Sequence, residues 1–418
     1  MPRRFSLKTR LLSLLLSAAM VLMFLPASAF AADDQQVRVG GTWLGSATRS
    51  VACGEGTAEY DPDTKTLTLT NATINHDYNA AIWNTVENLT IKLVGENSIN
   101  SGEQTGILNQ ELCGLLTLTG DGSLNITVTG GNAIYVNKGS LLIKDTTVKV
   151  SSGAFDACAV SADYGIEISG STLESAIANG NAIFVRGYMN GDLKIENSNV
   201  TTSNDNANGD GYPAIWCDGD ITINGGQLKS TCIGSDALGA AGTLSITNCN
   251  VENKGGYTAL YSRGKMTLTN ATVKATAQTY NALRASDVMK IDGGRVEATT
   301  FGEEEYAIHM EPMADGSNNG RMEIGGGVEL YVKGYNGISV GEEATIADAH
   351  IVIDSDDCSI DMPVKFAEGY DIALALGGDS KESAKPFDWY SMSLEPFTKG
   401  TPGTYRYLEL LSGAKHTL

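Results

Sequence analysis

Aromatic residues recur at one equivalent position along the chain. Each follows a small residue and an Ile or Leu, so each has the same local sequence before it. Flat aromatic rings beside polar groups hold sugar rings, which present apolar C–H faces and polar edges. The pattern predicts a glycan-binding platform. Its candidate residues, which include one arginine at the same position, are Trp83, Tyr135, Phe184, Trp216, Tyr261 and Arg284.

A structural role for the same residues stays open. Aromatic side chains on an exposed sheet face stabilise the sheet by packing against neighbours on adjacent strands, without any ligand. Loops could also cover such a row. An exposed aromatic row without clustered carboxylates would favour binding, and a row buried under loops would favour a structural spacer.

Paired carboxylates are the second chemistry to consider, because glycoside hydrolysis needs two of them about 5–10 Å apart. Acidic residues are plentiful, and the candidates are Asp218, Asp220, Asp292, Glu297 and Glu323. The chain lacks the Asn-Thr-Asp, Asp-Asp and Gly-His-Gly motifs of the pectin hydrolases and the Arg-x-Pro-x-x-Arg motif of the pectate lyases. We therefore assign no catalytic residue. Cleavage of an extracellular polysaccharide stays as the alternative function.

One loop has alternating oxygen donors, which is a weak pattern for calcium. Asn204, Asn206, Asn208 and Asp210 stand at every second position and precede a glycine. A complete EF-hand loop would also need a closing Glu, and none follows at that position. We expect no cofactor, with calcium at this loop as the weaker prediction.

A repeat must position these side chains. The small-apolar dipeptide occurs eleven times, about 22 to 32 residues apart, and two further alternating segments follow each copy. Alternation of apolar and polar residues indicates short strands with one buried face. Corners rich in Asn and Gly permit sharp turns. Three short strands per repeat predict an all-β, right-handed parallel β-helix of about eleven coils, with an antiparallel sandwich or barrel as the alternative.

The register within the repeat follows from the same pattern. If Ile134 and Val136 point inward, the equivalent residues in the other coils are apolar or small as well. A narrow, close-packed interior requires apolar or small side chains at these inward positions. The aromatic residue between the two inward positions then points outward.

The two ends of the chain depart from the repeat. Residues 1–31 have a basic start, an apolar run over 11–25 and small residues before Ala31, which predicts a secretory signal peptide. Residues 32–80 are expected to form an N-terminal cap and the first strands, residues 81–360 the repeats, and residues 361–418 a C-terminal cap. No later segment reaches ~18 consecutive apolar residues, so we expect no membrane insertion after cleavage.

Charge and cysteine content narrow the classes of partner. The chain has 29 basic and 49 acidic residues, a formal net charge of −20, which argues against nucleic acid as a ligand. Its seven cysteines lie outside residues 1–31 and show no zinc spacing. We expect them to be small apolar residues of the interior, with one or two disulfides as the alternative.

Several segments support a resemblance to a known family. They are VRVGG at 37–41, YDPDTKTLTL at 60–69 and units such as GDITINGG at 219–226. These resemble exported bacterial β-helix proteins of the carbohydrate-binding-domain type, within the wider pectate-lyase-like superfamily, over residues 37–360. The resemblance implies the fold and points to a carbohydrate ligand.

Together these patterns predict a secreted or cell-surface, non-catalytic protein for carbohydrate binding or adhesion. Its expected partner is a glycan, such as a host or cell-surface polysaccharide. The alternatives are a polysaccharide lyase or glycoside hydrolase, and a structural surface spacer.

Overall fold

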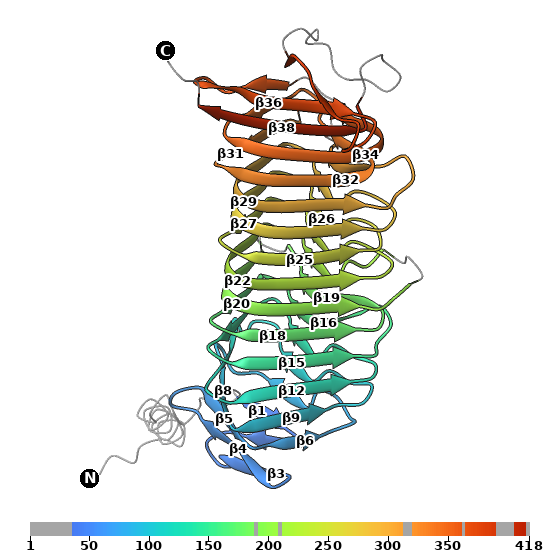
Figure 1. The fold of residues 1–418 in the computed structure, drawn as a ribbon. Coiled ribbons are helices and arrows are strands. Elements are labelled where there is room, and N and C mark those ends of the chain that lie inside the picture. Colours follow the sequence, from blue (N-terminus) through green and yellow to red (C-terminus); the bar gives the residue numbers. More distant parts are fainter. Residues whose placement is uncertain are drawn as a thin grey trace, which may run out of the picture.

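A computed structural model describes residues 36–187, 191–207, 211–311, 320–361, 364–389 and 405–414. Within these ranges every long element is a β-strand and there is no α-helix. The chain winds as a right-handed parallel β-helix of about eleven turns (Figure 1). This confirms the fold class predicted from the repeat. The described residues include no helix long and apolar enough to span a membrane.

Three parallel strand ladders run the length of the molecule, and we call them the first, second and third face. The first face contains β7 (Ile82–Asn84), β10 (Ile107–Asn109), β13 (Ile134–Val136), β16 (Ala157–Ala162), β19 (Gly180–Val185), β21 (Ile215–Cys217), β23 (Leu238–Ala240), β26 (Leu260–Ser262), β28 (Leu283–Ala285), β30 (Tyr306–Met310) and the ends of β32 (Val328–Ser339) and β34 (Ala349–Asp361).

The second face contains β5 (Thr66–Thr70), β8 (Thr90–Val94), β11 (Leu115–Thr119), β14 (Ser140–Lys144), β17 (Gly165–Ser169), β24 (Leu244–Thr247), β31 (Arg321–Gly325), β33 (Glu343–Ile346) and β35 (Val364–Phe366). The third face, in front in Figure 1, contains β6 (Thr73–Asn75), β9 (Glu96–Asn100), β12 (Ser123–Val128), β15 (Thr147–Ser152), β18 (Thr172–Ile177), β25 (Asn250–Gly255) and the starts of β32 and β34. Four long strands turn from the second face to the third without interruption, namely β20 (Asp192–Asn204), β22 (Ile221–Cys232), β27 (Met266–Ala277) and β29 (Val288–Thr300).

The core is the interior of the coil. On the first face Ile134 and Val136 are fully buried, and the paired residues one coil away, Ile107 below and Val160 above, are buried too. Each buried aliphatic side chain contributes about 1.5–3 kcal/mol relative to an exposed one. The burial of these residues confirms the predicted register. Like side chains from successive coils stack on one another and fill the narrow interior.

Antiparallel strands lie against both ends of the ladders. At the N-terminal end β1 (Val37–Val39) pairs with β7 and with β2 (Thr42–Leu44), while β3 (Ser50–Cys53) and β4 (Gly56–Asp61) add to β5. At the C-terminal end β38 (Tyr407–Ala414) covers β34 and pairs with β36 (Tyr370–Gly378), which also pairs with β37 (Lys385–Pro386). These strands satisfy backbone groups that open ladder edges would expose.

The corner between the second and third faces needs a left-handed residue in nearly every coil. Asn71 has a φ of 46° and Gly95, one coil on, has a φ of 66°. The Asn71 carboxamide oxygen accepts a hydrogen bond from the Glu96 backbone N–H at 3.2 Å, so it crosses directly over the glycine. A Cβ atom at position 95 would lie 2.0 Å from that oxygen. The corner therefore requires a glycine where the coil below supplies an asparagine.

We predict that Gly95→Ala strongly destabilises the protein. The substitution adds a left-handed alanine, which costs about 1–2 kcal/mol, and it also displaces the Asn71 side chain. Thermal unfolding should show a clear fall in Tm. Gly413→Ala is the matched control, because nothing lies within 4 Å of a Cβ at that position. Equal Tm values for the two variants would contradict the account of this corner.

All seven cysteines are free, and six of them are buried. Burial raises the pKa of Cys217 to about 12 and that of Cys158, Cys232 and Cys249 to about 11. The expectation of interior cysteines is confirmed. Only the thiolate is nucleophilic, so burial protects these thiols from reagents in two ways. It blocks access to the sulfur, and it raises the pKa of the thiol.

We predict that a thiol reagent such as Ellman's reagent reacts slowly with the folded protein at pH 8. In denaturant all seven thiols should react rapidly. Fewer than seven reactive thiols after unfolding without reductant would reveal a disulfide. Rapid reaction of the folded protein would contradict the burial described above.

Candidate functional site

The outward residues of the first face form one column, which we call the outward ladder. Each lies between two inward neighbours and pairs with its equivalent one coil away. All six residues predicted from the sequence belong to this column. In order it contains Arg38, Trp83, Leu108, Tyr135, Ser161, Phe184, Trp216, Gly239, Tyr261, Arg284, His309 and Ser339.

The aromatic side chains of the ladder are half-buried. Trp216 and Tyr261 come from strands two coils apart, yet their rings stack with centroids 6.3 Å apart and planes 24° apart. Gly239 on the intervening coil makes this possible, because a Cβ there would lie 2.6 Å from the Trp216 ring. The indole N–H of Trp216 donates to the Asp218 carboxylate at 2.7 Å. The pair is therefore held in one orientation before any ligand binds.

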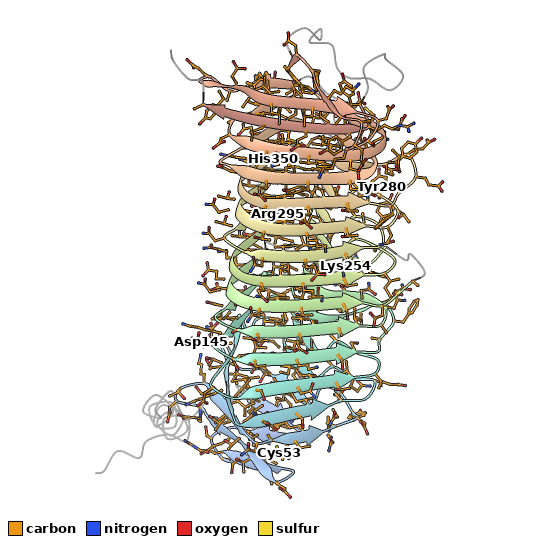
Figure 2. All side chains as sticks on the ribbon, in the orientation of Figure 1. Cys53, Asp145, Lys254, Tyr280, Arg295 and His350 are labelled. Atoms are coloured by element: carbon orange, nitrogen blue, oxygen red, sulfur yellow. The ribbon has the colours of Figure 1, made fainter. Side chains whose placement is uncertain are left out.

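Arg284 extends this pair toward the corner between the third and first faces. Its guanidinium lies 5.2 Å from the ring centroid of Tyr261 and 4.6 Å from that of Tyr280. Tyr280 in turn stacks on Tyr257, with ring centroids 4.6 Å apart and planes 12° apart. We call these five side chains the aromatic arc. Figure 2 shows Tyr280 at this corner.

The sequence analysis did not identify Tyr257 and Tyr280, although a signal was present. Each tyrosine stands two residues before a small-apolar dipeptide, and Tyr212 and Tyr335 occupy the same position in other repeats. For Tyr257 and Tyr280 that position lies in the corner, just before the strand of the first face begins, whereas Tyr335 lies within β32. The corner tyrosines therefore form a second row beside the ladder.

The charge of Arg284 acts on several groups around the arc. Arg284 forms an ion pair with Glu311. Burial raises the pKa of Asp236 and of Glu305, and the nearby Arg284 charge opposes part of each rise. Burial lowers the pKa of His309, and Arg284 lowers it further. The arc thus contains one paired cation, Arg284, and is bordered by two carboxyl groups with raised pKa values and a histidine with a lowered pKa.

The N-terminal part of the ladder is a separate cluster. Trp83 lies 6.2 Å from Trp43, and the Arg38 guanidinium lies 5.0 Å from Trp83 and 5.7 Å from Trp43. Gln110 accepts a hydrogen bond from the Trp83 indole at 2.9 Å. Arg38 lies on β1 and Trp43 lies on β2. The cluster therefore also packs these N-terminal antiparallel strands against the first face.

Tyr135 and Phe184 occupy the middle of the ladder. Their paired neighbours include Leu108 and Ser161, which supply no ring. Phe184 is covered on one side by Arg186, at 5.6 Å from its ring centroid. The ladder is therefore dense at its two ends and sparse between them.

Of the five candidate catalytic carboxylates, Asp292 and Glu323 line one pocket on the second face together with Lys290, and the other three lie elsewhere on the coil. Asp218 and Asp220 lie between the first and second faces, where Asp220 accepts a hydrogen bond from the Thr243 N–H at 2.7 Å. Asp292 and Glu323 lie on the second face, with Asp292 paired to Lys290 at 3.2 Å. Glu297 is on the third face, paired with Arg295 at 2.8 Å.

The structure describes two of the four residues predicted to bind calcium, Asn204 and Asn206. The Asn204 carboxamide donates to the carbonyls of Gly180 and Tyr212, and its oxygen accepts from the Asn206 N–H at 3.0 Å. The Asn206 carboxamide donates to Asn179 at 2.7 Å. Both side chains therefore close the base of the loop. Asn208 and Asp210 lie outside the described residues.

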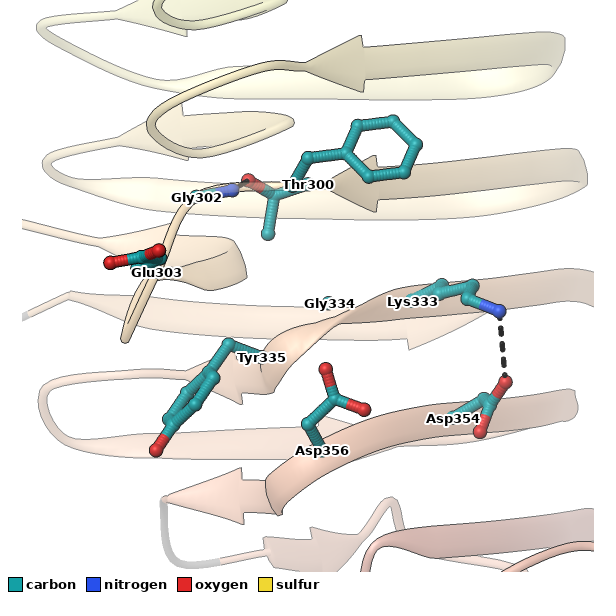
Figure 3. Close-up of a pocket in the computed structure, with 9 residues that line it drawn as sticks. Thr300, Gly302, Glu303, Lys333, Gly334, Tyr335, Asp354 and Asp356 are labelled. Carbon is teal, nitrogen blue, oxygen red and sulfur yellow. Dashed lines mark hydrogen bonds and ion pairs between the residues drawn. The ribbon is translucent and has the colours of Figure 1, made fainter.

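A shallow pocket of about 240 Å³ opens in the same corner as Tyr280, toward the C-terminal end. We call it the corner pocket (Figure 3). Three consecutive coils supply its lining, through the segment after β29, the middle of β32 and the later part of β34. The lining residues are Thr300, Phe301, Gly302, Glu303, Lys333, Gly334, Tyr335, Asp354 and Asp356.

Comparisons of the chain with protein-family models, with curated proteins and with solved structures found no match. The interpretation of the site therefore depends on its geometry.

We predict that Gly239→Ala separates Trp216 from Tyr261. The added methyl group would lie 2.6 Å from the indole, so the ring must move away. The near-ultraviolet circular dichroism and the tryptophan fluorescence should both change, while the far-ultraviolet spectrum should not. The Gly413→Ala variant is the control. Unchanged near-ultraviolet spectra in Gly239→Ala would contradict the stacking described for these rings.

Proposed function

We propose that this protein is an exported, non-catalytic glycan-binding protein that uses the outward ladder, and above all the aromatic arc, as its binding surface. The observation that carries the proposal is the arc itself. Trp216, Tyr261 and the corner tyrosines meet on one rigid surface, with Arg284 between them. The leader-like pattern of residues 1–31 supports a site of action outside the cytoplasm.

The chemistry of the arc suits a sugar chain. Aromatic faces contact apolar C–H groups, and polar groups at the ring edges accept or donate hydrogen bonds to hydroxyls. Here the polar groups are Asp218 beside Trp216 and the Arg284–Glu311 pair beside Tyr261. Strands hold Trp216 and Tyr261, and stacking orients Tyr257 and Tyr280, so little conformational entropy is lost when a ligand binds.

Cleavage of a polysaccharide is the second candidate, and one observation favours it. Asp236 and Glu305 have raised pKa values beside the arc, and a general acid needs a carboxyl group that stays protonated. The binding assay below separates the two functions, because an enzyme would also degrade the polymer.

We predict that the double variant Trp216→Ala with Tyr261→Ala binds glycan at least about tenfold more weakly, equivalent to ~1.4 kcal/mol. Loss of the two ring faces removes the apolar contact surface. Affinity electrophoresis through gels cast with neutral and acidic polysaccharides measures the retardation of each protein. Staining of the same gels for polymer reports any cleavage.

Tyr331→Ala is the matched control. Tyr331 is also an outward tyrosine with an arginine over its ring, Arg295 at 4.4 Å, but it lies on the third face. It should keep wild-type retardation. Equal retardation of the double variant and the wild type would show that the arc is not the binding surface. Cleared zones in the stained gels would favour an enzyme. No retardation of the wild type by any polymer would favour a structural spacer.

A further inference from the structure

We propose that the corner pocket binds the protonated amine of an amino sugar, so that the preferred glycan carries free amino groups. The inference rests on the proposed function and adds the substrate class. Its basis is the combination of a concave shape, one exposed and one half-buried aromatic ring, and two carboxylates that form no ion pair within the described part of the chain, all at one irregular point of the coil.

The irregularity lies in the register between β32 and β34. Gly334 pairs with Ser355 and Asn336 pairs with Cys358, so Tyr335 stands opposite two residues, Asp356 and Asp357. Such a bulge changes the direction of side chains and is common near functional sites. Here it places Tyr335 and Asp356 beside each other in the lining of the pocket, as Figure 3 shows.

The pocket has apolar walls and a backbone floor. Phe301 is 63% exposed, and Tyr335 is half-buried. Gly334 packs so closely on the coil below that a Cβ there would lie 2.6 Å from the Thr300 methyl group. The faces of aromatic rings attract organic cations, most strongly where solvent is partly excluded.

The charges in the pocket are unbalanced. Lys333 is paired with Asp354 at 3.4 Å, as the dashed line in Figure 3 shows. Glu303 and Asp356 form no ion pair with any other residue that the structure describes. Two uncompensated carboxylates beside two aromatic rings favour a ligand that is both cationic and partly apolar.

A metal ion fits this arrangement poorly. Within the described ranges no three acidic, histidine or cysteine side chains converge closely enough to hold one. A protonated amine needs fewer acidic groups, because a single carboxylate can pair with its N–H groups while its carbon substituents contact the rings.

The position of the pocket favours a sugar as the carrier of the amine. Tyr280, a member of the aromatic arc, occupies the corner in the coil just before Phe301. A polymer lying on the arc and continuing along the axis therefore reaches the pocket. The net charge of −20 attracts a polycationic glycan and repels a polyuronate.

The test compares the wild type with the double variant Glu303→Gln, Asp356→Asn. Calorimetry would measure binding of a glucosamine hexamer and of its fully N-acetylated equivalent. We expect the wild type to prefer the glucosamine hexamer, and the double variant to bind it at least tenfold more weakly while binding the acetylated hexamer as before. Glu174→Gln is the matched control, since Glu174 is a surface carboxylate of the third face, paired with Lys149 at 2.8 Å.

Protonation provides an independent readout. Raising the pH from about 6 to about 9 crosses the range in which amines beside electronegative groups lose their proton. The preference for the glucosamine hexamer should disappear at the higher pH. An unchanged preference at both pH values would overturn the role of the amine.

The outcomes separate this inference from the proposed function. If the acetylated hexamer binds through Trp216 and Tyr261 but Glu303 and Asp356 have no effect on either ligand, the inference fails and the glycan function stands. If neither hexamer binds, and no polysaccharide retards the protein, both fail. If a lysine hexamer binds as tightly as the glucosamine hexamer and with the same dependence on Glu303 and Asp356, the ligand is a basic peptide and the assignment to an amino sugar is wrong.

Discussion

The residue-by-residue pairing of each coil with the next is the constraint on which the rest of the structure depends. Once Ile107, Ile134 and Val160 stack inside, the residues beside them must stack outside in the same order. A side chain on this surface is therefore never isolated, because its neighbours along the axis are set by the repeat. Function on such a scaffold is built from columns, and a single glycine in a column changes what its neighbours can do.

This constraint explains what the sequence could predict and what it could not. The period and the inward residues give the register, and the register places Trp83, Tyr135, Phe184, Trp216, Tyr261 and Arg284 in one column. Contacts between columns follow different physics. The stacking of Trp216 on Tyr261 depends on the missing side chain at Gly239. In the sequence, Gly239 stands 23 residues after Trp216 and 22 residues before Tyr261. The bulge at Tyr335 depends on one extra residue in the neighbouring strand, which no local pattern reports.

The electrostatics around Arg284 show why residue type alone does not define a site. The sequence offers many carboxylates, and several of them lie on solvated faces beside a lysine or arginine, as Glu297 does. Asp236 and Glu305 differ because burial, more than any neighbouring charge, sets the direction of their pKa shifts. Burial in a corner depends on how neighbouring loops cover the group, so it becomes visible only in three dimensions. For the same reason the corner tyrosines, which supply half of the rings in the arc, lay outside the strand pattern.

The uneven distribution of rings along the ladder has a consequence for affinity. The arc and the Trp43–Trp83 cluster lie toward opposite ends of the coil, with Leu108 and Ser161 among the residues between them. A short ligand can contact only one cluster, and an aromatic contact contributes about 0.5–1.5 kcal/mol beyond its buried area. A polymer that contacts both makes the second contact at a high effective concentration, so its avidity exceeds either single affinity. The rigid axis keeps the two clusters at a constant separation. Under the proposed glycan-binding function, the arrangement selects for chain length as well as for sugar chemistry, which a compact binding domain with one pocket cannot do.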